Sequence, residues 1–231
     1  MSKFAFISDI HGNYAALKAV LRDIDAQQNV DKIYCLGDLV GYYSQINEVI
    51  DTVRNRHIEC VIGNHDYAMV HNAGVIYRSK TCTNVLTRQL EYIRTENLEF
   101  LRGLDSSMII VDGEYSIFAV HGGLNDYVDE YLPNLTEDYF KLLDGSITHV
   151  ITGHNHLPKV EQYGNIQYAN SGSVGQPRDN NPMAGYIIFE DGIFTIRRVA
   201  YDIKKTVQKM KEDGFPDYIA DILYKGCKIG E

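Results

Sequence analysis

The segment TGHNH contains two histidines separated by one residue, which are candidates for metal binding. His154 and His156 follow the apolar pair Val150 and Ile151 across a turn that Gly153 opens. Side-chain packing does not explain two imidazoles at such a turn, whereas metal binding does, because neutral imidazole nitrogens are common metal ligands. A solvent-exposed polar loop would explain the pentapeptide equally well, so the remaining sequence has to decide between the two.

The same arrangement occurs at four other places, where an apolar run leads directly into aspartate, asparagine or histidine. The four segments read FAFISDIHGN, IYCLGDLVGY, CVIGNHD and FAVHGG. In an open α/β sheet, ligands bind beyond the carboxyl ends of the strands, so residues at these positions would meet at one site. Together with the histidine pair, the segments supply seven candidate metal ligands: Asp9, His11, Asp38, Asn64, His121, His154 and His156.

The histidines outside these segments are interpreted differently. His57, His71 and His149 lie in helix-like or pre-strand contexts. For these residues we expect positions on the surface or in a core where their polar atoms are satisfied.

The donor atoms of the candidate ligands indicate the kind of ion. Imidazole, carboxylate and amide groups without a thiolate suit manganese, iron, zinc or nickel, and disfavour copper(I) and iron–sulfur clusters. The donors are too many for one ion, whereas two ions about 3.5–4 Å apart would use them all. We therefore expect two divalent transition-metal ions per chain, with manganese as the first choice. Asp38, the isolated carboxylate of the second run, is the candidate bridge between them.

The elements that position these residues follow from hydrophobic periodicity. Short β-rich runs are expected at 4–7, 33–36, 58–62, 108–111, 116–120, 150–151, 166–169, 186–189 and 194–199. Stripes with helical spacing occupy 15–24, 46–53 and 86–101 between the early runs. Later runs are joined by the turn signals DGE and EDG, which are typical of hairpins. The sequence therefore predicts an α/β fold of two mixed sheets packed face to face.

We expect one domain over residues 1–231, because no linker, low-complexity stretch or repeat divides the chain. Its C-terminal part, 201–225, is predicted to form two amphipathic helices that Gly214 and Pro216 separate. The segment 67–107 is the part of the chain that would form a lid over the metals.

Composition and charge limit the classes of partner. Hydrophobic residues make up 45% of the chain and charged residues 23%, as in ordinary globular proteins. A net charge of −9 without a basic stripe argues against nucleic acid. No signal-peptide core fits the first residues, no apolar run could span a bilayer, and the four cysteines are widely spaced. We therefore expect a cytoplasmic protein that contacts no membrane; its oligomeric state stays open.

The motifs D-x-H, GD, GNHD, H and GHxH, in this order between residues 9 and 156, resemble the calcineurin-like metallophosphoesterase superfamily. The segment NSGSVGQPRDNNP and the tail YDIKKTVQKMKEDGFP are similar to a bacterial branch of that superfamily. Ser171 stands where the branch has proline. The resemblance implies a four-layer α/β/β/α sandwich. It also implies one ion held by Asp9, His11, Asp38 and His156, and a second held by Asp38, Asn64, His121 and His154.

The function implied is a dinuclear metal-dependent phosphoric-ester hydrolase, in which a metal-bridging hydroxide attacks phosphorus in line. We expect His65 to assist the leaving oxygen, as a proton donor or by stabilising its charge, and Asp66 to orient His65. Arg178 is expected to grip phosphate, since a guanidinium binds it bidentately. Asn13 and Tyr42 are weaker candidates for substrate contact.

The substrate would be a small phosphorylated molecule, a nucleotide, a phosphodiester or a phosphopeptide, and the sequence does not choose among them. An alternative function is a non-catalytic metal-binding scaffold of the same fold. A nuclease is disfavoured, because the acidic chain lacks a surface for nucleic acid.

Overall fold

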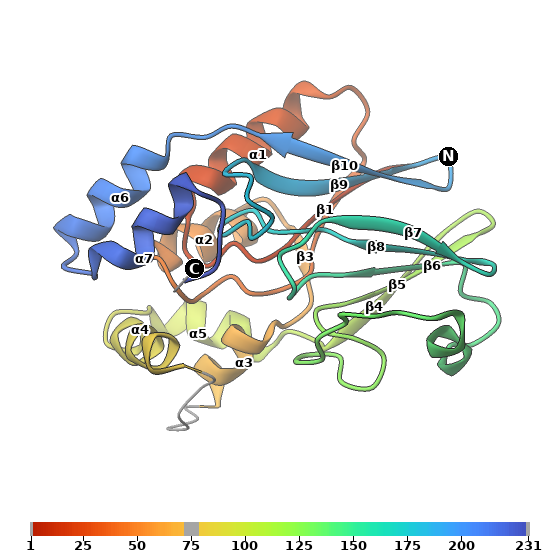
Figure 1. Cartoon of the computed structure of the whole chain (residues 1–231), viewed down its shortest axis with the longest axis horizontal. Coiled ribbons are helices and arrows are strands. Elements are labelled where there is room, and N and C mark those ends of the chain that lie inside the picture. The colour runs from red at the N-terminus through yellow and green to blue at the C-terminus, as the bar shows by residue number, and fades with distance from the viewer. Residues whose placement is uncertain (1, 72–78, 230–231) are drawn as a thin grey trace.

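Two five-stranded sheets packed face to face form the centre of the molecule (Figure 1). This computed structural model describes residues 2–71 and 79–229. The first sheet has the strand order β10 (Ile193–Val199), β9 (Ala184–Glu190), β1 (Lys3–Ile7), β2 (Lys32–Cys35) and β3 (Glu59–Cys60). The second has the order β4 (Ser107–Asp112), β5 (Tyr115–Val120), β6 (His149–Thr152), β8 (Ile166–Asn170) and β7 (Lys159–Tyr163).

Each sheet contains three neighbouring parallel strands. They are β1, β2 and β3 in the first sheet, and β5, β6 and β8 in the second. The remaining strands pair antiparallel: β9 with β1, β10 with β9, β4 with β5, and β7 with β8. The predicted α/β fold with two mixed sheets is therefore confirmed, and the DGE and EDG turns do join hairpins.

Alternation along the strands assigns each side chain to one of two hydrophobic layers. In β1, Phe6 packs between the sheets, while Ala5 faces the helices of the first sheet. In β5, Ile117 packs between the sheets, while Phe118 faces the other side of the second sheet. Since successive strand residues point to opposite faces, both sheets are buried on both faces near the middle of the fold.

Helices cover the outer face of the first sheet (Figure 1). They include α1 (Tyr14–Ala26), α2 (Ile46–Asn55) and α5 (Thr95–Arg102). The 3₁₀ helix η1 (Glu137–Leu142) and adjoining loop residues cover the outer face of the second sheet. A further hydrophobic cluster joins α4 (Lys80–Leu90) to α6 (Ile203–Glu212), α7 (Asp217–Asp221) and the 3₁₀ helix η2 (Ile222–Tyr224).

One predicted element needs correction, and one strand was not predicted. The helical stripe over 86–101 is divided between α4 and α5, because α4 ends at Leu90 and α5 begins at Thr95. The strand β7 was not predicted, since its sequence KVEQY contains no apolar run. It lies at the sheet edge and is half-buried or exposed, so main-chain pairing with β8 defines it.

The C-terminal helices lie where the sequence predicts them. The chain leaves α6 through Gly214, whose φ of +69° is costly for other residues, and Pro216 precedes α7. In the part of the chain that the structure describes, no helix combines the length and apolar character that crossing a membrane requires.

Candidate metal centre

The seven candidate ligands lie together beyond the carboxyl ends of parallel strands from both sheets. Asp9 and His11 follow β1, and Asp38 follows β2. Asn64 is the first residue of α3 (Asn64–Val70), which comes after β3. His121 follows β5, and His154 and His156 follow β6. All seven are buried, with exposed fractions between 0% and 5%. Aspartate, asparagine and histidine side chains from both sheets therefore converge at one edge.

One group of donors surrounds Asp9. Its Oδ1 atom lies 3.1 Å from Nε2 of His156 and 3.8 Å from Nε2 of His11. The two Nε2 atoms are 3.3 Å apart. These three atoms have the mutual spacing of ligands around a single ion.

A second group surrounds Asn64. Its Oδ1 atom lies 3.0 Å from Nε2 of His121 and 3.1 Å from Nδ1 of His154. The other nitrogen of His154 lies 3.6 Å from Oδ1 of Asp129. Asp129 was not predicted as part of the site, because it lies in a loop that no apolar run precedes.

Asp38 lies between the two groups. Its Oδ2 atom is 3.6 Å from Nε2 of His11 in the first group and 3.4 Å from Nε2 of His121 in the second. Its Oδ1 atom accepts a hydrogen bond from the main-chain N–H of His65 at 2.8 Å. That bond fixes the carboxylate, so that Oδ2 faces both groups.

Three imidazole rings are oriented in the same way. Their Nδ1 atoms lie close to main-chain carbonyl oxygens: His11 to Val40 (2.8 Å), His121 to Leu36 (2.7 Å) and His156 to Gln176 (2.6 Å). A carbonyl oxygen only accepts, so each Nδ1 carries the hydrogen and donates it. The Nε2 atoms are then free of hydrogen in the neutral ring, which is the arrangement that metal-binding histidines use.

The turns that carry the candidate ligands have an unusual backbone. Five of the residues adopt φ angles between 52° and 66°: Asp9, His11, Asp38, His154 and His156. Such left-handed conformations cost about 1–3 kcal/mol each for residues other than glycine, although aspartate and histidine tolerate them better than most. Buried surroundings therefore hold the ligand turns in conformations that the isolated chain would avoid.

Two glycines let the main chain approach these side chains closely. A Cβ atom at Gly63 would lie 2.2 Å from Oδ1 of Asp38. Gly41 has a φ of +102°, and a Cβ atom there would lie 2.5 Å from Nδ1 of His65. Any larger residue at either position would displace a side chain of the site.

The electrostatics of the cluster suit a cation. Burial raises the pKa of Asp38, but the neighbouring His121 and His65 hold it well below its usual range. Burial lowers the pKa of His121, and Asp38 overcomes this effect and raises it to about 10. Oδ1 of Asp9 is buried without a hydrogen-bond donor among the described residues, although it faces Nε2 of His156. A divalent ion would bind the lone pairs of the Asp9 and Asp38 carboxylates and replace the proton on His121.

His65 lies beside this cluster and lines a cleft. Its ring centre is 4.7 Å from that of His11 and 5.1 Å from that of Tyr42. Burial lowers the pKa of His65 to about 4, an effect that Asp38 opposes and Arg178 reinforces. The ring is therefore neutral at neutral pH in the protein without substrate.

The prediction that Asp66 orients His65 needs correction. Oδ1 of Asp66 accepts hydrogen bonds from the main-chain N–H groups of Leu39 (2.9 Å) and Val40 (3.1 Å). Oδ2 accepts one from the N–H of Gly63 at 3.1 Å. The side chain thus braces two ligand turns against each other, because its carboxylate points into the main chain of those turns.

The prediction that Asn13 contacts substrate is also wrong. Asn13 is fully buried, and its Oδ1 atom accepts from the N–H of Ala16 as the N-cap of α1. It also accepts from the hydroxyl of Thr206 at 2.8 Å, and its amide donates to the carbonyl of Gly175 at 2.9 Å. Asn13 therefore ties α6 to a ligand turn instead of facing the cleft.

Arg178 and Tyr42 do line the cleft. Arg178 donates from Nη2 to the hydroxyl of Tyr42 at 3.2 Å. It also donates from Nε and Nη2 to Oε1 of Gln176, at 3.1 and 2.7 Å. These bonds fix the plane of the guanidinium beside the candidate ligands.

The cleft has a volume of about 510 Å³. Four of its lining residues were not predicted: Ser79, Cys82, Tyr131 and Lys228. Ser79 and Cys82 come from the start of α4, within the expected lid; residues 72–78 of that lid lie outside the described residues. Tyr131 and Lys228 come from a loop and from the C-terminal segment, whose local sequence carries no signal for a site.

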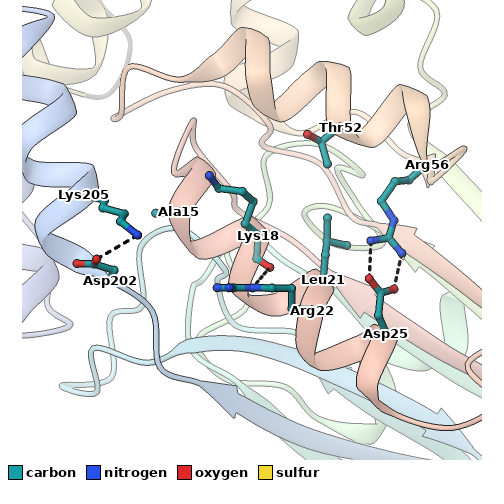
Figure 2. A pocket seen from close by; sticks show the side chains of 9 residues that line it. All are labelled: Ala15, Lys18, Leu21, Arg22, Asp25, Thr52, Arg56, Asp202 and Lys205. Carbon is teal, nitrogen blue, oxygen red and sulfur yellow. Dashed lines mark hydrogen bonds and ion pairs between the residues drawn. The ribbon is translucent and has the colours of Figure 1, made fainter.

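Figure 2 shows another pocket, of about 320 Å³, between α1, α2 and the start of α6. Two of its four cations are paired with carboxylates: Arg56 with Asp25 at 2.9 Å and Lys205 with Asp202 at 3.4 Å. It contains none of the candidate ligands. This pocket is therefore separate from the candidate metal centre.

The part of the chain that contains the candidate ligands is similar to known proteins. The family described as calcineurin-like phosphoesterase superfamily domain matches residues 2–191, which include all seven candidate ligands. An uncharacterized protein of Methanocaldococcus jannaschii is 35% identical, over 97% of this chain and 98% of its own length. Phosphodiesterase YfcE of Escherichia coli is 25% identical, over 85% of this chain and 91% of its own.

A solved structure has the same fold as this chain. The metallophosphoesterase from Sphaerobacter thermophilus is 30% identical to this chain and superimposes with a TM-score of 0.82. The match covers 97% of this chain and 99% of the other. The likeness therefore extends over both sheets and the C-terminal helices.

Proposed function

The chain belongs to the calcineurin-like phosphoesterase superfamily and is a metal-dependent phosphoesterase, and we propose that it hydrolyses a phosphoric ester with two divalent ions. The observation that carries the proposal is the position of Asp38. Its Oδ2 atom lies within 3.6 Å of a donor atom in each of the two groups. A bridging carboxylate between two ions about 3.5–4 Å apart requires such a position.

Each group would hold one ion. Asp9, His11 and His156 would bind the first, and Asn64, His121 and His154 the second, with Asp38 shared. The mixed imidazole, carboxylate and amide donors favour manganese, iron, zinc or nickel, and manganese is the first choice. When bound, the ions supply an activated water as the nucleophile and positive charge for the phosphoryl oxygens.

We infer the part of His65 in the reaction from its burial. Because burial lowers its pKa to about 4, its ring would be neutral at neutral pH and would act as an N–H donor, not as a cation. In the cleft it would donate to the leaving oxygen and stabilise the negative charge that develops there. Of the two roles expected from the sequence, the geometry and charge thus favour charge stabilisation.

Arg178 would bind the phosphoryl group. Gln176 and Tyr42 hold its guanidinium plane, so little side-chain entropy is lost when it binds an anion. Tyr42 would act through Arg178, because its hydroxyl accepts from the guanidinium.

The test is a substrate panel for the manganese-loaded protein: aryl monoesters, aryl diesters, nucleotides, dinucleoside polyphosphates and a phosphopeptide. We expect hydrolysis of at least one class, abolished by a chelator and restored by manganese. A protein that retains its metals but hydrolyses no member would instead be the non-catalytic scaffold of the same fold. Hydrolysis that resists complete metal removal would also overturn the proposal.

A further inference from the structure

The lining of the cleft contains a cation that the proposed hydrolysis does not use. Lys228, in the C-terminal segment after η2, lines the same cleft as Asp38, His65 and Arg178. Its side chain comes from a part of the chain more than seventy residues beyond His156. The end of the described chain thus forms part of the active-site wall.

Buried neighbours determine where Lys228 lies. Cys227 on one side is 7% exposed, and Ile229 on the other packs against the hydrophobic cluster between the cleft and the C-terminal helices. The carbonyl of Gly226 accepts a hydrogen bond from the N–H of Asn180 at 2.9 Å. Lys228 is exposed between these anchored residues and lines the cleft, so neighbours on both sides hold its backbone beside the cleft.

The charge of the cleft differs from that of the whole molecule. The chain carries a net charge of −9. Among the described residues that line the cleft, Arg178 and Lys228 are cations and Asp38 is the one carboxylate. Asp38 belongs to the candidate metal centre, so the charged residues that line the cleft outside that centre are both positive, and Lys228 is the one that the proposed hydrolysis leaves unassigned. A cleft of about 510 Å³ also has room for more than a phosphoryl group.

We propose that Lys228 forms a second anion subsite, and that the preferred substrate is a phosphoester with a second phosphate group on its leaving portion. The proposal rests on the function proposed above, because the reacting phosphate must lie on the metal centre for Lys228 to meet the leaving portion. The reaction itself is unchanged: water adds to phosphorus, the ester P–O bond breaks, and the leaving oxygen takes a proton. Lys228 binds the second phosphate and takes no part in bond breaking.

Non-hydrolysable probes test the subsite apart from catalysis. Phenylphosphonate carries one anionic group, whereas benzene-1,4-bisphosphonate and its homologues with one or two methylene spacers carry a second. Calorimetric titration of the manganese-loaded protein at low ionic strength measures the ratio of the two dissociation constants. We expect at least one bisphosphonate to bind wild type about threefold to tenfold more tightly than phenylphosphonate, and added salt to reduce the ratio.

Variants assign the effect to one side chain. In Lys228→Met the ratio of the two dissociation constants should fall to about one, while the affinity for phenylphosphonate stays the same. Lys228→Arg should keep the wild-type ratio. Lys225→Met, at an exposed lysine outside the cleft lining, is the matched control and should behave as wild type. An equal ratio in wild type and Lys228→Met overturns the subsite, as does a wild-type ratio of one for every spacer. Neither result depends on turnover, so failure of the substrate panel remains a separate outcome.

Discussion

The cleft has two parts that the chain holds differently. We call the candidate ligands and His65 the floor, and Tyr131 and Lys228 the rim. On the floor, candidate ligands are at most 5% exposed, and three imidazoles donate to main-chain carbonyls. On the rim, Tyr131 is 44% exposed, and Lys228 of the C-terminal segment is exposed as well. The floor is buried and hydrogen-bonded to the main chain, whereas the rim is exposed to solvent.

This difference separates chemistry from selection. A preorganised floor loses little free energy to reorganisation when charge develops, which favours one reaction for many esters. A rim built from loops and the C-terminal segment can differ between relatives without disturbing the ligand turns. We therefore expect substitutions on the floor to abolish catalysis, and substitutions on the rim to change affinity for particular substrates.

The largest expected effect is at the residue that the two ligand groups share. Asp38→Asn removes the negative charge between them, and we expect kcat for the best panel substrate to fall about 10³- to 10⁴-fold. Steady-state kinetics of the manganese-loaded protein measure this effect. Asp138→Asn, at a carboxylate with an 81% exposed side chain, is the control. A kcat within tenfold of wild type would show that Asp38 is not a bridge.

A smaller effect is expected at the side chain beside the ligands. His65→Asn should lower kcat about 10²- to 10³-fold, because it removes a donor to the leaving oxygen. The loss should shrink for esters with acidic leaving groups, and both ions should remain. His57→Asn, at an exposed histidine, is the control. His65 also has the spacing of a metal ligand relative to His11 and Asp38. If the His65→Asn variant lost an ion, His65 would therefore be identified as a ligand.

Between floor and rim, Gln89 of α4 supports the turn that contains Gly41. Its side chain accepts from the N–H of Gly41 at 3.0 Å and donates to the carbonyls of Gly41 (3.0 Å) and Tyr43 (2.8 Å). Gln89→Met leaves these buried groups unpaired, and we expect the free energy of unfolding to fall by about 2–4 kcal/mol. Urea denaturation checks this value, with Gln208→Met on an exposed face as control. A loss below about 0.5 kcal/mol would contradict the supporting role.

The smallest effect is expected at Arg178, where floor meets rim. Arg178→Lys retains the charge but not the planar fork, so we expect KM to rise about tenfold with metal content unchanged. Steady-state kinetics over a range of substrate concentrations separate KM from kcat. The exposed Arg102→Lys is the control. Unaltered kinetics in Arg178→Ala would remove this residue from the substrate site.

The floor was predictable from sequence because its residues follow apolar runs. A strand that ends in aspartate or histidine places that residue at the sheet edge, and five such strands define one site. The direction of a side chain is not encoded in this way. Asp66 and Asn13 lie next to candidate ligands in sequence, yet their side chains turn into the main chain and brace ligand turns.

The rim was not predictable, because it depends on contacts between distant segments. Lys228 reaches the cleft through packing of the C-terminal segment on α4 and on the turn at Tyr42. The strand β7 presents the same difficulty, since it is defined by its partner β8 and not by its own sequence. Local patterns give the elements and the strand ends, whereas tertiary packing decides what closes over them.

The most direct test of the central claim is a count of metal ions per chain. Elemental analysis after manganese loading and removal of free metal should give about two equivalents for wild type. His156→Ala and His154→Ala each alter a different ligand group, so each should retain about one equivalent. A wild-type value of one, left unchanged by both substitutions, would contradict the dinuclear centre.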